Sequence, residues 1–168
     1  IGGELSTDRL LLAYSNGYFP YFAYKLDPTP EWHCPLTRFV IFPKEIHVSH
    51  SMRQLINKGL YEVTINKDFM GVINGCCKVD GRNRELGAWL SPDIIKAYTE
   101  LHKQGYAASV EVWKKDNNVD KLVGGLYGVN IGLGCFGESM FSTQTDVSKM
   151  AFYVLMLIGK KNNLPWID

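Results

Sequence analysis

The chain lacks a long hydrophobic run and a strong excess of charge of either sign, and each absence excludes a class of protein. Its best apolar stretch, residues 151–158, is about half the length that a membrane-spanning helix needs. The formal net charge of +1 argues against a protein that grips long stretches of nucleic-acid backbone, because such binding rests on many lysine and arginine contacts. Any contact with a nucleic acid is therefore expected to be local.

Cysteine and histidine patterns are also missing. The four cysteines, two of them adjacent at Cys76 and Cys77, show no spacing typical of a disulfide framework. Ile1 is not followed by the basic and then apolar stretch of a secretion signal. His47 and His50 lie three apart with no cysteine or carboxylate at a matching spacing, so we expect no metal site. These features predict a soluble protein of the cytoplasm with no membrane contact.

What is present is a mixture of helix and strand signals. Ser6, Asn66, Ser91-Pro92-Asp93 and Asp146 are each placed to begin a helix, and the last of these helices has apolar residues three and four apart. Strand-forming runs cover residues 39–42, 61–65, 107–113, 122–131, 134–140 and 164–168. The chain is therefore predicted to be α+β, and the strand at its end suggests that the fold continues past residue 168.

An aromatic cluster occupies residues 14–32, mostly within a proline-rich stretch, 18–35, that is predicted to be a loop. Flat rings on a loop can stack on nucleic-acid bases. They can equally pin the loop to the core.

Two carboxylates stand in apolar surroundings. Glu138 lies in Gly137-Glu138-Ser139-Met140-Phe141, and Asp168 follows Trp166 and Ile167 at a predicted strand end. A buried carboxylate is costly unless it is paired, so each is either satisfied by nearby donors or used to hold a cation or an amine. The glycine-rich run 124–128 lacks the nucleotide-binding fingerprints and is interpreted as a bulged hairpin in close backbone contact with a neighbour.

The order of these signals resembles that of the leucyl/phenylalanyl-tRNA-protein transferase family over essentially the whole chain. The matching segments include Gly2-Gly3-Glu4-Leu5-Ser6, Phe19-Pro20-Tyr21-Phe22, His47-Val48-Ser49, Ser109-Val110-Glu111-Val112-Trp113, Leu122-Val123-Gly124-Gly125-Leu126-Tyr127-Gly128-Val129 and Gly137-Glu138-Ser139-Met140-Phe141-Ser142. The resemblance implies an acetyltransferase-like (GNAT) mixed sheet with helices at residues 43–168, incomplete at its C-terminus. Residues 1–42 would form a small N-terminal lobe with the aromatic loop.

The resemblance also implies an enzyme that moves Leu or Phe, and more weakly Met, from aminoacyl-tRNA to proteins with an N-terminal Arg or Lys, marking them for degradation by the N-end rule. It implies no cofactor, and we expect a monomer. The site residues that it implies fall into two groups. Substrate-binding residues would be Tyr14, Tyr21, Trp89, Tyr98, Leu126 and Cys135, with Tyr21 and Trp89 flanking the terminal adenine and Leu126 and Cys135 in the apolar pocket. Catalytic residues would be Glu138 and Asp168, joined by a glutamine two positions past the end.

By itself, Cys135 could be a nucleophile, but no nearby base is indicated, so a small buried residue is the safer interpretation. Two other functions stay open: an acyl-CoA-dependent acyltransferase of the same fold, with residues 124–134 around a pyrophosphate, and a non-catalytic module that clamps peptide N-termini between Glu138 and Asp168.

Overall fold

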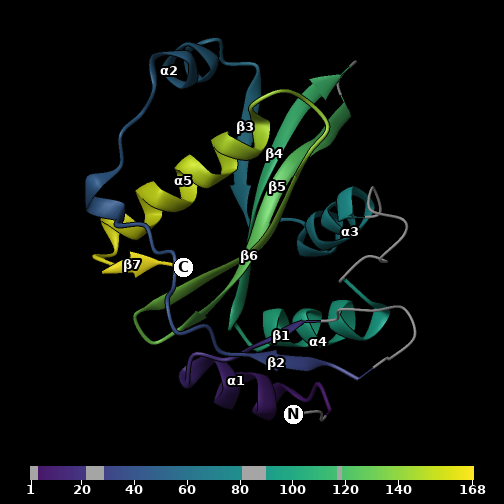
Figure 1. Ribbon diagram of the computed structural model, residues 1–168. Helices are drawn as coiled ribbons and strands as arrows, with labels where there is room; N and C mark the ends of the chain where they lie inside the picture. Colours follow the sequence, from purple (N-terminus) through teal and green to yellow (C-terminus); the bar gives the residue numbers. More distant parts are fainter. Residues whose placement is uncertain (1–3, 22–28, 81–89, 117–118) are drawn as a thin grey trace.

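A twisted five-stranded sheet forms the centre of the chain in a computed structural model, which describes residues 4–21, 29–80, 90–116 and 119–168 (Figure 1). The strands lie in the order β3-β4-β5-β6-β7, and all neighbours are antiparallel except β6 and β7. Their bounds are Tyr61–Ile65 (β3), Ala107–Asp116 (β4), Val119–Ile131 (β5), Gly134–Ser142 (β6) and Trp166–Ile167 (β7). The predicted α+β class is confirmed.

Helices cover both faces of this sheet. Helix α5 crosses one face, and α3 and α4 lie on the other (Figure 1). The described residues form three buried apolar clusters: one beneath α3 and α4, one beneath α5 and α2, and a small one of Cys135, Met156 and Ile167. The helices are α1 (Thr7–Ser15), α2 (His50–Asn57), α3 (Phe69–Asp80), α4 (Pro92–Lys103) and α5 (Val147–Lys161), with a 3-10 turn η1 (Pro43–Glu45). None of the helices described is long and apolar enough to cross a membrane.

Two of the four predicted helix caps are confirmed. The side chain of Ser6 accepts from the backbone N–H of the third helical residue of α1, and Ser91 does the same for α4. The prediction for Asn66 is wrong: its side chain accepts from a β4 amide, and Asp68 accepts from the Gly71 N–H at 2.8 Å instead. Asp146 stands at the N-cap of α5 but pairs with a lysine. Residue type therefore predicted where these helices begin, while tertiary packing determined which side chain accepts from the free backbone N–H groups.

The predicted loop at residues 18–35 contains two short paired strands, β1 (Phe19–Tyr21) and β2 (Glu31–His33). The strand predicted at 39–42 is reduced to one bridge, in which Ile41 and Ile167 exchange two backbone hydrogen bonds of 2.8 Å. Both differences have one cause: pairing depends on a partner segment brought close by the fold. This partner cannot be read from local composition.

The glycine-rich strand confirms the predicted bulge and close backbone contact. Tyr127 pairs with Ser139, but the next residue, Gly128, pairs with Gly137, so Glu138 is left over as the extra residue of β6. A Cβ atom on Gly128 would lie 2.4 Å from the Phe136 carbonyl oxygen. Only glycine allows this approach, and a β-bulge turns the extra side chain away from the regular alternation of the strand.

Candidate active site

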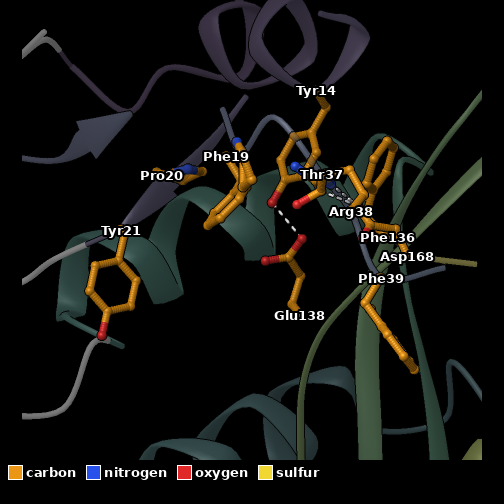
Figure 2. A pocket seen from close by; sticks show the side chains of 12 residues that line it. Tyr14, Phe19, Pro20, Tyr21, Thr37, Arg38, Phe39, Phe136, Glu138 and Asp168 are labelled. Atoms are coloured by element: carbon orange, nitrogen blue, oxygen red, sulfur yellow. Dashed lines mark hydrogen bonds and ion pairs between the residues drawn. The ribbon is translucent and has the colours of Figure 1, made fainter. Parts of the chain in front are cut away.

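A cavity of about 400 Å³ lies where the N-terminal strand pair meets β6 and the end of β7 (Figure 2). The rings of Phe19, Tyr21 and Phe136 line it. Its polar walls include Glu138 and Asp168, which reach it from the bulge of β6 and from the residue after β7. Two carboxylates thus share one partly apolar cavity with aromatic rings.

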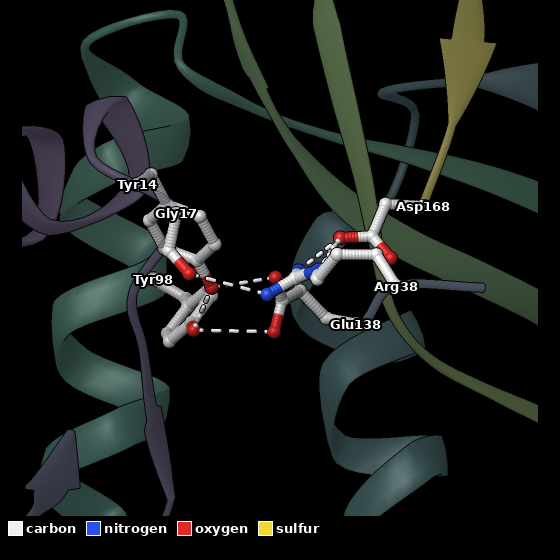
Figure 3. A network of polar contacts seen from close by, with 6 residues as sticks. All are labelled: Tyr14, Gly17, Arg38, Tyr98, Glu138 and Asp168. Atoms are coloured by element: carbon white, nitrogen blue, oxygen red, sulfur yellow. Dashed lines mark hydrogen bonds and ion pairs between the residues drawn. The ribbon is translucent and has the colours of Figure 1, made fainter. Parts of the chain in front are cut away.

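Glu138 points toward two tyrosines of α1 and α4 (Figure 3). The Tyr14 hydroxyl donates to Oε1 of Glu138 at 2.5 Å, and the Tyr98 hydroxyl donates to Oε2 at 3.2 Å. The two hydroxyl oxygens are themselves 2.5 Å apart. Three hydrogen bonds join the three groups, but the tyrosines supply only two hydrogens. When the carboxyl group is protonated, its hydrogen completes a ring in which each group donates once, and when it is ionised both tyrosines can donate to it.

The electrostatics of the site place this carboxyl group between its protonated and ionised forms near neutral pH. Burial raises the pKa of Glu138 to about 7 against the lowering effect of the two tyrosine hydrogen bonds, and the charge of Asp168 adds to the rise. Burial and the charge of Glu138 raise the pKa of both tyrosines well above the ordinary value. The hydroxyls therefore stay protonated as donors, and the carboxyl group is the member of the ring that titrates near neutrality.

Asp168 has a different partner. Arg38, from the segment after β2, donates from Nε to Oδ2 of Asp168 at 2.6 Å, and its Nη2 forms an ion pair with the same oxygen. The guanidinium also donates from Nη1 to the Gly17 carbonyl oxygen at 3.2 Å and lies over the ring of Phe19. Asp168 is therefore held by a permanent cation that is itself tied to the end of α1.

A second cavity, of about 340 Å³, adjoins the first, and the two share Phe39, Gly137, Glu138 and Asp168. Its remaining lining is largely apolar and comes from the strands, from α5 and from the segment before η1: Ile41, Leu126, Tyr127, Ser139, Met140, Phe152, Leu155 and Ile167. The carboxylates thus stand between an aromatic cavity and an apolar one.

The structure brings most of the predicted site residues together. Tyr14, Tyr21, Glu138 and Asp168 line the first cavity. Leu126 lines the second. Tyr98 is buried behind the first cavity and reaches it through Glu138.

Two predicted residues are not placed there. Cys135 is buried against α5 with Met156 and Ile167 and lines neither cavity, and burial raises the pKa of its thiol to about 11. Phe152, Leu155 and Ile167, which line the second cavity, pack in the same cluster as Cys135, so its side chain lies behind that lining. Trp89 lies outside the described residues.

Arg38 was not singled out in the sequence. It stands in Pro35-Leu36-Thr37-Arg38, where a lone arginine looks like an ordinary surface residue. One sequence feature could have indicated Arg38 as a site residue: it is a cation within an aromatic and proline-rich segment, and the chain also carries two isolated carboxylates. Its partner is 130 residues away, so the pairing itself required the fold.

Comparison with known sequences gives the family. The profile described as "Leucyl/phenylalanyl-tRNA protein transferase" matches residues 40–168, and the one for that family's N-terminal domain matches residues 3–36. The chain belongs to the leucyl/phenylalanyl-tRNA-protein transferase family. The site described above therefore lies within the part of the chain that carries the family's sequence pattern.

Relatives in this family are similar along the whole chain. A leucyl/phenylalanyl-tRNA-protein transferase of Thermodesulfovibrio yellowstonii is 45% identical over 168 residues, which is all of this chain and 66% of the relative. One from Flavobacterium johnsoniae is 46% identical, again over the whole chain and 76% of the relative. The chain thus spans about two thirds to three quarters of the length of these relatives.

Among solved structures, a ribosomal-protein-S5-alanine acetyltransferase from Vibrio fischeri superposes with a TM-score of 0.39 and 18% identity. That match covers 62% of this chain and 67% of the acetyltransferase. A superposition this loose carries no argument about chemistry.

Proposed function

We propose that the chain carries the donor site of an aminoacyltransferase, which moves Leu or Phe from the 3′ end of aminoacyl-tRNA to the N-terminal amine of proteins beginning with Arg or Lys. Met would be a weaker donor. The products would be marked for degradation by the N-end rule, and the reaction would take place in the cytoplasm. No cofactor is required, because the ester of aminoacyl-tRNA is already activated.

One observation carries this proposal: two cavities of different character meet at the same pair of carboxylates. A ring on the first cavity, Tyr21 above all, can stack on the terminal adenine. The second cavity, on Leu126, can take an apolar aminoacyl side chain. An aminoacyl-adenosine that spans both places its ester carbon beside Glu138 and Asp168, where the chemistry has to occur.

The charges of the site suit an amine as the second substrate. With Glu138 ionised, the two carboxylates and Arg38 sum to −1, which matches one cationic group of an incoming N-terminal Arg or Lys. The reaction breaks the ester C–O bond and forms the amide C–N bond. The amine loses a proton, and the ribose oxygen leaves with one. Asp168 would orient the α-amine and Glu138 would support it, and positioning of this kind supplies much of the rate.

The test is transfer of radiolabelled Phe from tRNA to a protein with an N-terminal Arg, by the complete protein and its Asp168→Ala variant. We expect the variant to lose transfer by roughly 100-fold or more, while its affinity for puromycin, an aminoacyl-nucleoside mimic, stays nearly unchanged. Leu126→Ala should keep transfer but favour the larger Phe over Leu, because it enlarges the apolar cavity. Retained turnover in the Asp168 variant would refute the role given to this carboxylate.

An acyl-CoA-dependent reaction is less well supported. The glycines at 124–128 lie inside β5, and this strand is paired with β4 on one side and β6 on the other. Their amides are therefore used in the sheet rather than free to cradle a pyrophosphate. Stabilisation against heat by acetyl-CoA but not by puromycin would reverse this preference.

A further inference from the structure

The guanidinium of Arg38 joins the elements that form the first cavity. It contacts Asp168 after β7 and the Gly17 carbonyl oxygen after α1 (Figure 3). It also lies over the ring of Phe19 in β1. The side chains of Arg38 and Asp168 are 28% and 13% exposed, so the pair is largely withdrawn from solvent. Weakly exposed pairs are less screened by water and salt, and this pair can fix a geometry that a surface pair could not.

Both donors of Arg38 that reach Asp168 contact the same oxygen. Nε and Nη2 are directed at Oδ2, and no hydrogen bond to Oδ1 is found among the described residues. The guanidinium group is planar and rigid, so two of its donors on one oxygen fix the place of that oxygen. The two oxygens of Asp168 are thereby made unequal: one is held by the protein and one is left for a ligand.

The backbone of Asp168 is also fixed, so the oxygen that Arg38 leaves free has a defined place. The backbone N–H of Asp168 donates to the Cys135 carbonyl oxygen at 2.9 Å, and its own carbonyl oxygen accepts from the Gly137 N–H at 2.7 Å. The backbone is thus fixed against β6 beside the Glu138 bulge. The side-chain rotation of Asp168 remains as the main freedom, and Arg38 removes it.

We propose that Arg38 is a positioning residue for aminoacyl transfer, which pins Oδ2 of Asp168 so that Oδ1 is presented to the α-amine of the acceptor. This inference rests on the proposed function. Arg38 itself does not contact the reacting atoms. Its removal leaves the rings of the first cavity and the apolar lining of the second present but lets the carboxylate rotate. The loss is therefore expected mainly in kcat rather than in binding of the donor.

The test compares kcat and KM of the unaltered complete protein with those of Arg38→Ala and Arg38→Lys. Phenylalanyl-adenosine serves as the donor and a peptide beginning with Arg as the acceptor. We expect Arg38→Ala to lower kcat by roughly 100-fold with less than a threefold change in KM for the donor. Arg38→Lys keeps the charge but loses the paired N–H donors of the guanidinium group, and its kcat should be about 10-fold lower than that of the unaltered protein. Arg53→Ala, at an exposed arginine of α2, is the matched control and should keep the full rate.

Chemical rescue separates positioning from a general structural role. Guanidinium at tens of millimolar should raise the kcat of Arg38→Ala by about 10-fold. Equal concentrations of sodium chloride should leave it unchanged. A kcat of Arg38→Ala within threefold of the unaltered protein, or a loss that guanidinium does not restore, overturns the inference. If Arg38→Ala fails to fold, Arg38→Lys decides, and a rate within twofold of the unaltered protein overturns it. No transfer by the unaltered protein would instead refute the proposed function, and this inference with it.

Discussion

Glu138→Gln should remove a specific dependence of stability on pH. The amide of Gln mimics the protonated acid, since its oxygen can accept from Tyr14 and its NH₂ can donate to Tyr98, which preserves the ring of three hydrogen bonds. What the substitution takes away is the proton that Glu138 gains and loses. The stability of the two proteins should therefore agree at low pH and separate as the pH rises.

The magnitude follows from the raised pKa of Glu138. Between its ordinary value of 4.5 and the folded value of about 7, the folded state binds a proton that the unfolded state has lost, so the free energy of unfolding falls as the pH rises through this window. At about 1.4 kcal/mol per pKa unit, the loss amounts to roughly 3 kcal/mol and is complete above pH 7. Glu138→Gln avoids this loss.

The assay is urea unfolding at half-unit steps from pH 4.5 to 8.5. We expect the unfolding free energy of Glu138→Gln minus that of the unaltered protein to grow by roughly 3 kcal/mol across this range. Glu62→Gln, at an exposed glutamate of β3, controls for the loss of one acidic group. A difference that stays constant with pH would refute the raised pKa of Glu138.

Two further predictions concern β6 and its neighbour. Gly128→Ala should lower the free energy of unfolding by about 2 kcal/mol, because a Cβ atom would lie 2.4 Å from the Phe136 carbonyl oxygen. Thermal unfolding checks this against Gly132→Asn, where a φ of 58° and open space tolerate the change, and equal melting temperatures would contradict it. The exposed thiol of Cys34 should react quickly with iodoacetamide, while Cys135 should react only on unfolding, because it is buried and its pKa is raised to about 11. Mass spectrometry of the labelled peptides measures both rates, and equal labelling would show that Cys135 is reachable.

The elements that local patterns determine were predicted correctly. Apolar spacing and a capping serine specify α1 and α4, and the strand at Tyr61–Ile65 follows from its β-forming residues. The bulged hairpin at the glycine run followed from the absence of side chains there. Each of these signals acts within about ten residues, so no knowledge of distant partners was needed.

Part of the site followed from composition as well. A carboxylate among apolar residues is costly wherever it lies, which is why Glu138 and Asp168 stood out before their surroundings were known. The resemblance to a family added Tyr14, Tyr21, Tyr98 and Leu126 to the prediction, and the fold places these six residues at or directly behind two adjoining cavities.

The tertiary structure decided the remaining features, because they join residues far apart in the chain. Tyr14 meets Tyr98 and Glu138 across separations of 84 and 124 residues, and Arg38 meets Asp168 across 130. A shifted pKa depends on the charges and hydrogen bonds of such distant partners and on burial. Neither can be predicted from the local sequence. The sequence by itself determined which side chains could do chemistry here. Only the folded chain decided that one carboxyl group is hydrogen-bonded by two tyrosines while the other is held by an arginine.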